Sequence, residues 1–243
     1  MGIEISWRSQ AGKRTDDNRD CAGVGMRGDE ALCIILDGST TGPDSGALAR
    51  RVARDMIDWF VATDEAVTAE SLIVRLRAIH TGLSGHLPRA SASYMIVHIR
   101  LPDALLALHA GDCLLGQLVG EEAIEWLCRP HTLANALGAD VSIAAIAGQA
   151  ARHRLTRSFR VREFLVPDVA TLNAEGDIVV ATDGFWADLS AGDQIRFLKG
   201  QSIPMPADGD DCSALWLRVI DAVPEILVRG AEAETDDFYV RQE

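Results

Sequence analysis

Apolar residues follow one another without interruption in several short runs, and three of these runs end at an aspartate beside a glycine. The run from Ala31 to Leu36 ends at Asp37-Gly38, and the run in "GDIVVATDGFW" ends at Asp183-Gly184. A third run, "ALLALHAGDC", ends with the order reversed, at Gly111-Asp112. Continuous apolar runs of this length predict buried strands. Each aspartate is therefore expected at a strand end, where a rigid element presents its carboxylate.

Two other segments carry apolar residues at helical spacing. Leu48 and Val52 begin one predicted helix, and residues 69–83 form a second. Ser213 to Val228 is also helical in pattern, with Pro224 bending that helix or marking its first turn. A short helix is predicted at "AGDQIRFLKG". Further strands are predicted at "EISW", "CAGVGM", "SYMIVHIR", "CLLGQLVGEEAIEWLCRP" and "DDFYVRQE".

Blocks of strands and blocks of helices come in pairs along the chain, unlike the strict alternation of a βαβ protein. This order favours an α+β layered domain. From His131 to Val166 the pattern is weak, and "SIAAIAGQAARHRL" is read either as helix or as a mobile excursion over a site. We predict a single domain over residues 1–243, in which residues 139–160 form a flap or an irregular segment.

The composition fits a folded domain and narrows the functions. The chain of 243 residues is 48% hydrophobic, and no run reaches the roughly 18 apolar residues of a membrane span. Lys plus Arg is 23 and Asp plus Glu is 36, so the net charge is −13 and nucleic acid is a poor partner. The first residues lack a basic segment followed by an apolar one, which argues against a secretory signal. Five cysteines without a CxxC pair favour a reducing compartment, so we expect a cytoplasmic protein without membrane attachment.

The aspartates at the run ends have two readings. Asp-Gly is the commonest hairpin dipeptide, so each pair taken alone is first read as a turn. Three such endings in one chain also suit a shared site, because a neighbouring glycine permits close approach of backbone to a ligand. Converging carboxylates repel one another unless a cation lies between them. Ligands that are all oxygen select hard ions, chiefly Mg²⁺, Mn²⁺ or Ca²⁺.

The order of the motifs decides between these readings. The chain runs through "AGKRTDDNRDCAGV", "CIILDGSTTGPDSG", "LHAGDCLLGQL", "IVVATDGFWADLS" and "TDDFYV". In this order and spacing it resembles the metal-dependent serine/threonine protein phosphatases of the type-2C or PPM family, in their minimal bacterial form. The most specific motif is "ATDGFWADLS", and the resemblance covers Gly12 to Val240. It implies a four-layer α-β-β-α sandwich, in which two mainly antiparallel sheets pack face to face between helices, with a two-metal site at one edge.

The resemblance also implies a set of metal ligands. Asp37 matches the carboxylate that bridges both ions, and the carbonyl of Gly38 adds a ligand to one of them. Asp183 and Asp236 match the ligands of the other ion. These three aspartates, Asp37, Asp183 and Asp236, are the expected catalytic residues, and the cofactors are two Mg²⁺ or Mn²⁺ ions with a third as an option.

Three further residues have supporting roles by the same resemblance. Asp20 ends "NRD" and would support the metal site through water. Asp112 would help to bind the weaker third ion together with Asp183. The substrate phosphate is expected to contact Arg14, because the arginine of the family falls at Thr15 in this register and a one-residue adjustment of the loop lets Arg14 serve. As solvated loop cations, Arg14 and Lys13 have an equally good reading.

The chain departs from the family pattern at several positions. Arg19 replaces an acid or amide, and a cation there is costly unless it points away or pairs with Asp16 or Asp17. After Asp37-Gly38, "STTG" replaces the usual residues, and "TDDF" replaces the closing Asp-Asn. Cys113 beside Asp112 is read as a packed thiol rather than a nucleophile, because nothing nearby suggests a lowered pKa.

Two functional hypotheses follow. The first is Mg²⁺- or Mn²⁺-dependent hydrolysis of phosphoserine or phosphothreonine in proteins by a monomer that opposes a Ser/Thr kinase; a small phosphorylated molecule is an alternative substrate. The second is a phosphatase-like binding or regulatory domain with weak or no turnover, which rests on Arg19, the altered turn and the missing arginine at Thr15.

Overall fold

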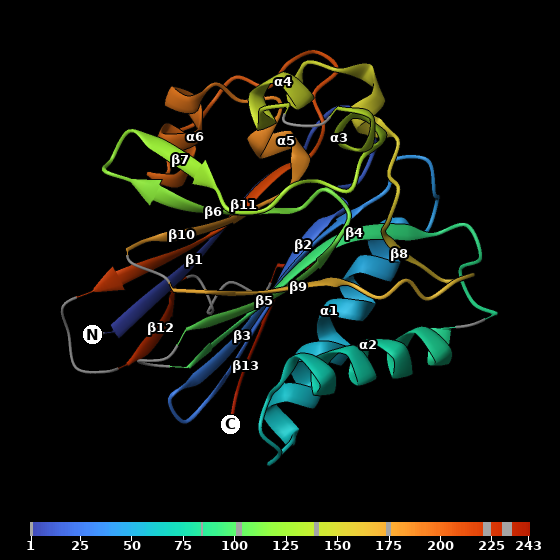
Figure 1. Ribbon diagram of the computed structural model, residues 1–243, viewed down its shortest axis with the longest axis vertical. Coiled ribbons are helices and arrows are strands. Elements are labelled where there is room, and N and C mark those ends of the chain that lie inside the picture. Colours follow the sequence, from blue (N-terminus) through green and yellow to red (C-terminus); the bar gives the residue numbers. More distant parts are fainter. Residues whose placement is uncertain are drawn as a thin grey trace.

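Two β-sheets lie face to face and collect strands from both halves of the chain (Figure 1). The computed structural model describes residues 2–83, 85–100, 104–138, 141–173, 176–220, 225–229 and 235–243. The first sheet has the strand order β13-β2-β3-β4-β5-β9, with β8 paired to β4, and the second has the order β12-β1-β11-β10-β6-β7. The first sheet is built from β2 (Asp20–Arg27), β3 (Glu30–Gly38), β4 (Ser91–Arg100), β5 (Leu105–Ala110), β8 (Phe159–Arg160), β9 (Asp168–Leu172) and β13 (Phe238–Gln242). The second is built from β1 (Gly2–Gln10), β6 (Leu114–Val119), β7 (Ala123–Trp126), β10 (Ile178–Ala181), β11 (Cys212–Ile220) and β12 (Ile226–Arg229).

Helices cover the outer faces of both sheets. On the first sheet, α1 (Ser45–Ala62) and α2 (Ala69–Leu83) lie side by side (Figure 1). The buried residues of each helix recur every third or fourth position, so each turns one apolar face inward. On the second sheet, α5 (Asp183–Trp186) and α6 (Ala191–Leu198) pack through Phe185 and Phe197. The shorter α3 (Leu133–Leu137), α4 (Ile143–Ala147) and a 3₁₀ helix (Ala150–His153) lie beside them. The expected four-layer α-β-β-α sandwich is confirmed.

The space between the sheets is filled by alternate residues of the facing strands. Ile5 of β1, Ile35 of β3 and Leu215 of β11 are fully buried there. Antiparallel strands explain the alternation, because successive side chains point to opposite faces. Both faces of the central strands are covered, so their sequences read as continuous apolar runs.

The predicted helix from Ser213 to Val228 is wrong. The structure has two strands there, β11 and β12, on either side of residues 221–224, which lie outside the described ranges and include Pro224. In β11 Leu215 faces the core between the sheets, while Trp216 packs toward the helices on the outer face. Apolar residues on both faces of a strand imitate the spacing of a helix, which is why the pattern misled.

The other predicted helices and strands are present. The two helices that follow Asp37-Gly38, the short helix at 191–198 and the closing strand all form near their predicted positions. The turn expected at Leu101-Pro102-Asp103 lies outside the described residues. None of the helices in the described ranges is long and apolar enough to cross a membrane.

Candidate active site

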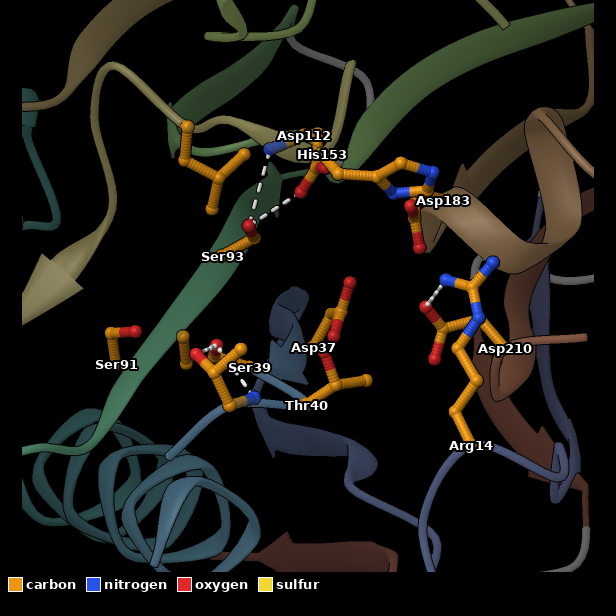
Figure 2. A pocket seen from close by; sticks show the side chains of 13 residues that line it. Arg14, Asp37, Ser39, Thr40, Ser91, Ser93, Asp112, His153, Asp183 and Asp210 are labelled. Carbon is orange, nitrogen blue, oxygen red and sulfur yellow. Dashed lines mark hydrogen bonds and ion pairs between the residues drawn. The ribbon is translucent and has the colours of Figure 1, made fainter. Parts of the chain in front are cut away.

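Four carboxylates from distant parts of the chain gather at one end of the sandwich. Asp37 is the penultimate residue of β3, Asp112 lies between β5 and β6, and Asp183 follows β10. Asp210 lies two residues before β11. Together with Arg14 these four line a pocket of about 290 Å³, and Figure 2 shows them around a common opening. The structure therefore brings Asp37, Asp112, Asp183 and Arg14 together, as the sequence predicted.

Glycines beside two of these aspartates permit close packing. Neither dipeptide is a hairpin turn, because Asp37-Gly38 lies at the end of β3 and Asp183-Gly184 begins α5. A Cβ on Gly38 would lie 2.8 Å from the backbone of Ser45, where α1 begins. A Cβ on Gly184 would lie 2.1 Å from the carbonyl oxygen of Asp211. Both distances are shorter than real Cβ contacts, so only glycine fits. Gly184 thus allows the segment before β11, and Asp210 with it, to approach Asp183.

The carboxylates sit in an electrostatically unfavourable arrangement. Burial raises the pKa of Asp37 well above its ordinary value, and the nearby charges of Asp20 and Asp183 raise it further. The pKa of Asp183 is raised well above its ordinary value by burial and then by Asp112 and Asp210. Burial also raises the pKa of Asp112. Both causes disfavour the ionised form, so these carboxylates need a positive charge among them.

Asp20 is buried beside Asp37, and one of its carboxylate oxygens has no donor among the described residues. It faces Asp37 across the pair of strands β2 and β3, and the hydroxyl of Thr182 donates to its Oδ2 at 2.9 Å. Its Oδ1 is buried and has no hydrogen-bond partner among the described residues. Burial raises the pKa of Asp20 well above its ordinary value, and Asp211 adds to the shift. A buried oxygen without a donor, together with a donor set made of carboxylates, fits a divalent ion or the water around one.

Asp112 is held by three hydrogen bonds. The hydroxyl of Ser93 donates to its Oδ1 at 2.5 Å and accepts from its backbone N–H at 3.2 Å. The indole Nε1 of Trp186 donates to its carbonyl oxygen at 2.8 Å. The second oxygen of the Asp112 carboxylate is engaged by no hydrogen bond from the described residues. The carboxylate is thus oriented and still able to bind a cation.

The loop before β2 places Arg14 at the rim of the pocket. The Nη1 of Arg14 lies 2.6 Å from Asp210 Oδ2, and its Nε donates to the carbonyl of Asp208 at 2.8 Å. Asp211 fixes the loop by accepting from the backbone N–H of Gly12 at 2.7 Å and of Arg19 at 2.8 Å. Asp210 and Asp211 therefore have separate tasks, one toward the pocket and one toward the loop that carries Arg14.

Arg19 points away from the carboxylates. Its Nε donates to Asp17 at 3.0 Å. Its Nη1 donates to the carbonyl oxygens of Ser39, Thr40 and Gly42 at 2.9, 3.2 and 2.8 Å. Arg19, which replaces an acid or amide of the family pattern, therefore organises the turn that follows Asp37-Gly38. Two departures from the family pattern thus form a single contact.

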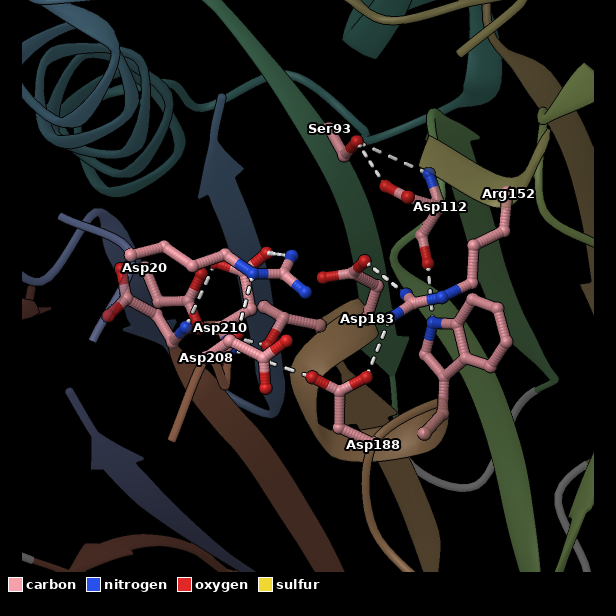
Figure 3. A network of polar contacts seen from close by, with 12 residues as sticks. Asp20, Ser93, Asp112, Arg152, Asp183, Asp188, Asp208 and Asp210 are labelled. Carbon is pink, nitrogen blue, oxygen red and sulfur yellow. Dashed lines mark hydrogen bonds and ion pairs between the residues drawn. The ribbon is translucent and has the colours of Figure 1, made fainter. Parts of the chain in front are cut away.

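Arg152 lies inside the carboxylate cluster, which the sequence did not reveal. Its Nη1 is 2.6 Å from Asp183 Oδ2 and its Nη2 is 2.6 Å from Asp188 Oδ1 (Figure 3). The side chain is buried and comes from the 3₁₀ helix, so residues 141–160 contribute directly to the site. A guanidinium here offsets part of the negative charge that burial makes costly.

Asp236 is not brought into the pocket. It is exposed on the turn that leads into β13, where an isolated bridge joins Thr235 to Phe238. In its place the structure offers Asp210, from "GDDCSALWL". Asp210-Asp211 directly precedes an apolar run, which could have indicated a carboxylate at a strand end. Because residues 213–228 are predicted as a helix, the sequence analysis does not place a strand there.

His131 is hydrogen-bonded to Gly111, the residue before Asp112. The group His109, His131 and Asp168 has ligand atoms within 4.8 Å of one another, which raises the question of a second metal site. His131 Nδ1 accepts from the backbone N–H of Gly111 at 3.2 Å, so the proton is on Nε2, which donates to Asp168 at 2.9 Å. The ring of His109 is stacked on it at 6°. Lone pairs in parallel planes do not converge on one ion, so this group holds the Gly111-Asp112 turn instead.

Cys113 is buried beside the site, in surroundings that disfavour its thiolate. Burial raises its pKa well above the ordinary value, and the neighbouring charges of Asp37 and Asp112 raise it further. The thiolate is the nucleophilic form, so this environment disfavours nucleophilic attack. The interpretation of Cys113 as a packed residue agrees with these surroundings.

Comparisons with known proteins identify the fold. No protein-family model matches the chain, and no curated protein matches its sequence. Among solved structures, the serine/threonine phosphatase Stp1 from Staphylococcus aureus is similar with a TM-score of 0.73 at 15% identity, over 90% of this chain and 96% of that one. The serine/threonine phosphatase of S. agalactiae gives 0.72 at 21% identity, over 90% of this chain and 100% of that one. The PPM Ser-Thr phosphatase MsPP from Mycobacterium smegmatis, solved in complex with cacodylate, gives 0.70 at 16%, over 89% and 98%. The chain has the fold of the bacterial PPM-type phosphatases, as the motifs indicated.

Proposed function

We propose that the protein hydrolyses phosphoserine or phosphothreonine in proteins with the help of Mg²⁺ or Mn²⁺. The observation that carries the proposal is the convergence of Asp37, Asp183 and Asp210 on one pocket with Arg14 at its rim. The similar structures are serine/threonine phosphatases, which supports the reaction class. The five cysteines are free, which supports a reducing, cytoplasmic location.

The chain's own residues have distinct roles in this proposal. Asp37, with the carbonyl of Gly38, would contact one ion and share the second with Asp183 and Asp210. Asp20 would bind through water, and Asp112 with Asp183 would form a weaker third position. When bound, a pair of such ions supplies a water of lowered pKa and offsets charge on the phosphoryl oxygens. Arg14 would leave Asp210 and orient the substrate phosphate, a group that a planar guanidinium binds well.

A second candidate function is a binding or regulatory domain without turnover. The observation that favours it is that two arginines already pair with proposed ligands, Arg14 with Asp210 and Arg152 with Asp183. Cations built into the site would make divalent ions less necessary. The two functions differ in whether the folded protein turns over a phosphomonoester.

The test measures hydrolysis of an aryl phosphate and of a phosphothreonine peptide with Mn²⁺ or Mg²⁺. Asp183→Asn and Asp210→Asn are each expected to lower kcat/KM by about 100-fold or more, because each removes charge that stabilises the transition state. Asp236→Asn is the matched control, with the same chemical change on an exposed turn, and should stay within about twofold of the wild type.

Calorimetric titration with Mn²⁺ accompanies the kinetics. Weaker Mn²⁺ binding is expected in the two site variants and unchanged binding in Asp236→Asn. Folded wild-type protein that hydrolyses neither substrate with either ion would establish the binding domain instead. Loss of activity in Asp236→Asn, with Asp210→Asn unaffected, would reverse the assignment of the ligand.

A further inference from the structure

One short segment of this acidic protein is strongly basic. Between Val141 and Arg162 the sequence contains no aspartate or glutamate, although the chain as a whole carries a net charge of −13. Its second half, "RHRLTRSFRVR", holds five arginines and a histidine. A local reversal of charge on such a background marks a surface that attracts anions.

This segment runs along the border of the active-site pocket. His153 and Leu155 line that pocket themselves. The chain then forms β8, which pairs with the first residues of β4 next to the site (Figure 1). Arg160, in β8, and Arg162, just after it, therefore lie beside the opening through which a substrate would enter.

A second cleft, of about 460 Å³, continues from the pocket along this border. The two share the lining residues Thr41 and Ser91, so they lie next to each other. We call this second space the arginine cleft, because three of its lining residues are arginines and none is acidic. It is lined by Thr41, Pro88, Arg89, Ala90, Ser91, Arg160, Val161 and Arg162.

The arginines of the cleft are not neutralised within the protein. Arg160 donates only to neutral oxygens, Ser158 Oγ at 2.9 Å and the carbonyl of Leu155 at 3.1 Å. Arg89 and Arg162 are exposed. Within the described ranges, no carboxylate lies within ion-pair distance of any of the three. By contrast, the arginines of the adjoining pocket, Arg14 and Arg152, both pair with aspartates.

We propose that the arginine cleft binds acidic residues on one side of the phosphorylated residue, so that the preferred substrates are phosphopeptides with a glutamate- or aspartate-rich flank. This inference rests on the proposed phosphatase function. Arg160 is held in place by its two hydrogen bonds and serves as the fixed contact, while Arg89 and Arg162 adapt to the peptide. Exposed guanidinium groups steer an acidic chain toward the pocket at low salt, and screening weakens them as salt rises.

The test compares phosphothreonine peptides that differ only in charge. Three glutamates are placed before the phosphothreonine in one peptide and after it in another, and glutamines replace them in the reference peptide. With Mn²⁺ at low salt, one acidic peptide is expected to exceed the reference in kcat/KM by about tenfold, the summed effect of three exposed ion pairs. The advantage should shrink as NaCl rises from about 0.05 M to about 0.5 M.

Variants locate the effect in the cleft. The double variant Arg160→Gln, Arg162→Gln should lose most of the advantage and leave hydrolysis of an aryl phosphate unchanged, because neither residue lines the catalytic pocket. Arg51→Gln, Arg241→Gln is the matched control, with the same change of net charge at exposed positions on α1 and β13. It should keep the advantage.

A binding measurement separates this inference from the proposed function. Anisotropy of labelled peptides that carry a non-hydrolysable phosphonate reports the preference without turnover. The proposed role of the arginine cleft is wrong if the protein hydrolyses the aryl phosphate but shows equal kcat/KM and equal affinity for all three peptides. It is also wrong if both double variants lose the advantage of the acidic peptide to the same extent. Tighter binding of an acidic phosphonate peptide by a protein that hydrolyses nothing supports the cleft and overturns the phosphatase.

Discussion

At the scale of single residues, Arg152 changes how the carboxylate cluster is understood. Its guanidinium bridges Asp183 and Asp188 and is buried with them. The positive charge explains how the metal-free protein can hold so many acids at one place. It also means that a divalent ion near Asp183 competes with an internal cation.

Replacing Arg152 with methionine should therefore destabilise the metal-free protein by about 3–5 kcal/mol, the usual cost of removing one partner from a buried ion pair. Mn²⁺ should restore part of this loss, because it supplies the missing positive charge to Asp183. Urea unfolding in EDTA and in Mn²⁺ measures both values. Arg51→Met, at an exposed pair on α1, is the control and should change stability by less than about 0.5 kcal/mol. Equal losses in EDTA and in Mn²⁺ would mean that Arg152 acts through packing alone.

Individual site residues could be predicted from the sequence where they end an apolar run. Asp37, Asp112 and Asp183 are of this kind: the apolar runs predict the strand ends near which they lie, and the resemblance of the ordered motifs to the PPM family assigned them to one site. Arg152 could not be predicted, since it comes from a segment without clear periodicity and acts by reaching across space. Asp210 was hidden because the strand that follows it was taken for a helix.

At the scale of elements, the site depends on how closely α5 approaches the segment before β11. Gly184 sits at the contact, with no room for a Cβ beside the Asp211 carbonyl. The same segment carries Asp210 into the pocket and Asp211 to the loop of Arg14. One glycine thus sets how Asp183, Asp210 and the loop of Arg14 lie relative to one another.

Gly184→Ala should push these segments apart. We expect a loss of about 1–3 kcal/mol in unfolding free energy, as in other overpacked interiors. Mn²⁺ affinity should fall by about 10-fold or more, because Asp210 moves relative to Asp183. Chemical unfolding and calorimetry measure these quantities. Gly192→Ala in α6 is the matched control: its Cβ would meet nothing within 4 Å, and alanine favours a helix. A Gly184→Ala protein that binds Mn²⁺ like the wild type would show that the contact does not position the ligand.

The elements themselves were predictable to different degrees. The helices α1 and α2 each bury one stripe, so their periodicity was plain in the sequence. β11 buries both faces, one against the first sheet and one against the helices above it. Burial on both faces removes the alternation of apolar and polar residues by which a strand is distinguished from a helix in the sequence. The strand is then recognised only in the folded structure.

At the scale of the whole molecule, the acids of the site connect the two sheets. Asp37 belongs to the first sheet, while Asp183 and Asp210 flank strands of the second. In the metal-free protein the raised pKa values of Asp20 and Asp37 mean that the folded state holds protons that the unfolded chain releases above about pH 4. The contribution of these groups to the free energy of unfolding therefore falls as the pH rises from about 4 through their raised pKa values.

Added Mn²⁺ must displace those protons, so its stabilising effect should grow with pH. We expect the difference in Tm between protein in Mn²⁺ and protein in EDTA to increase from about pH 5.5 to about pH 7.5. Groups with lowered pKa values, such as Glu4 and Glu30, contribute equally with and without the ion and cancel in the difference. Thermal unfolding at several pH values is the measurement. A difference that stays constant over this range would show that the acids are already ionised in the metal-free state.

The contact between Arg19 and the turn after Gly38 has a consequence for protein engineering. Arg19, in the loop just before β2, donates to three carbonyl oxygens of this turn, those of Ser39, Thr40 and Gly42. Transplanting "STTG" alone into another protein of this fold would therefore move the turn without the side chain that holds it. Arg19 and the "STTG" turn must be transferred together, and replacing either one requires replacing the other.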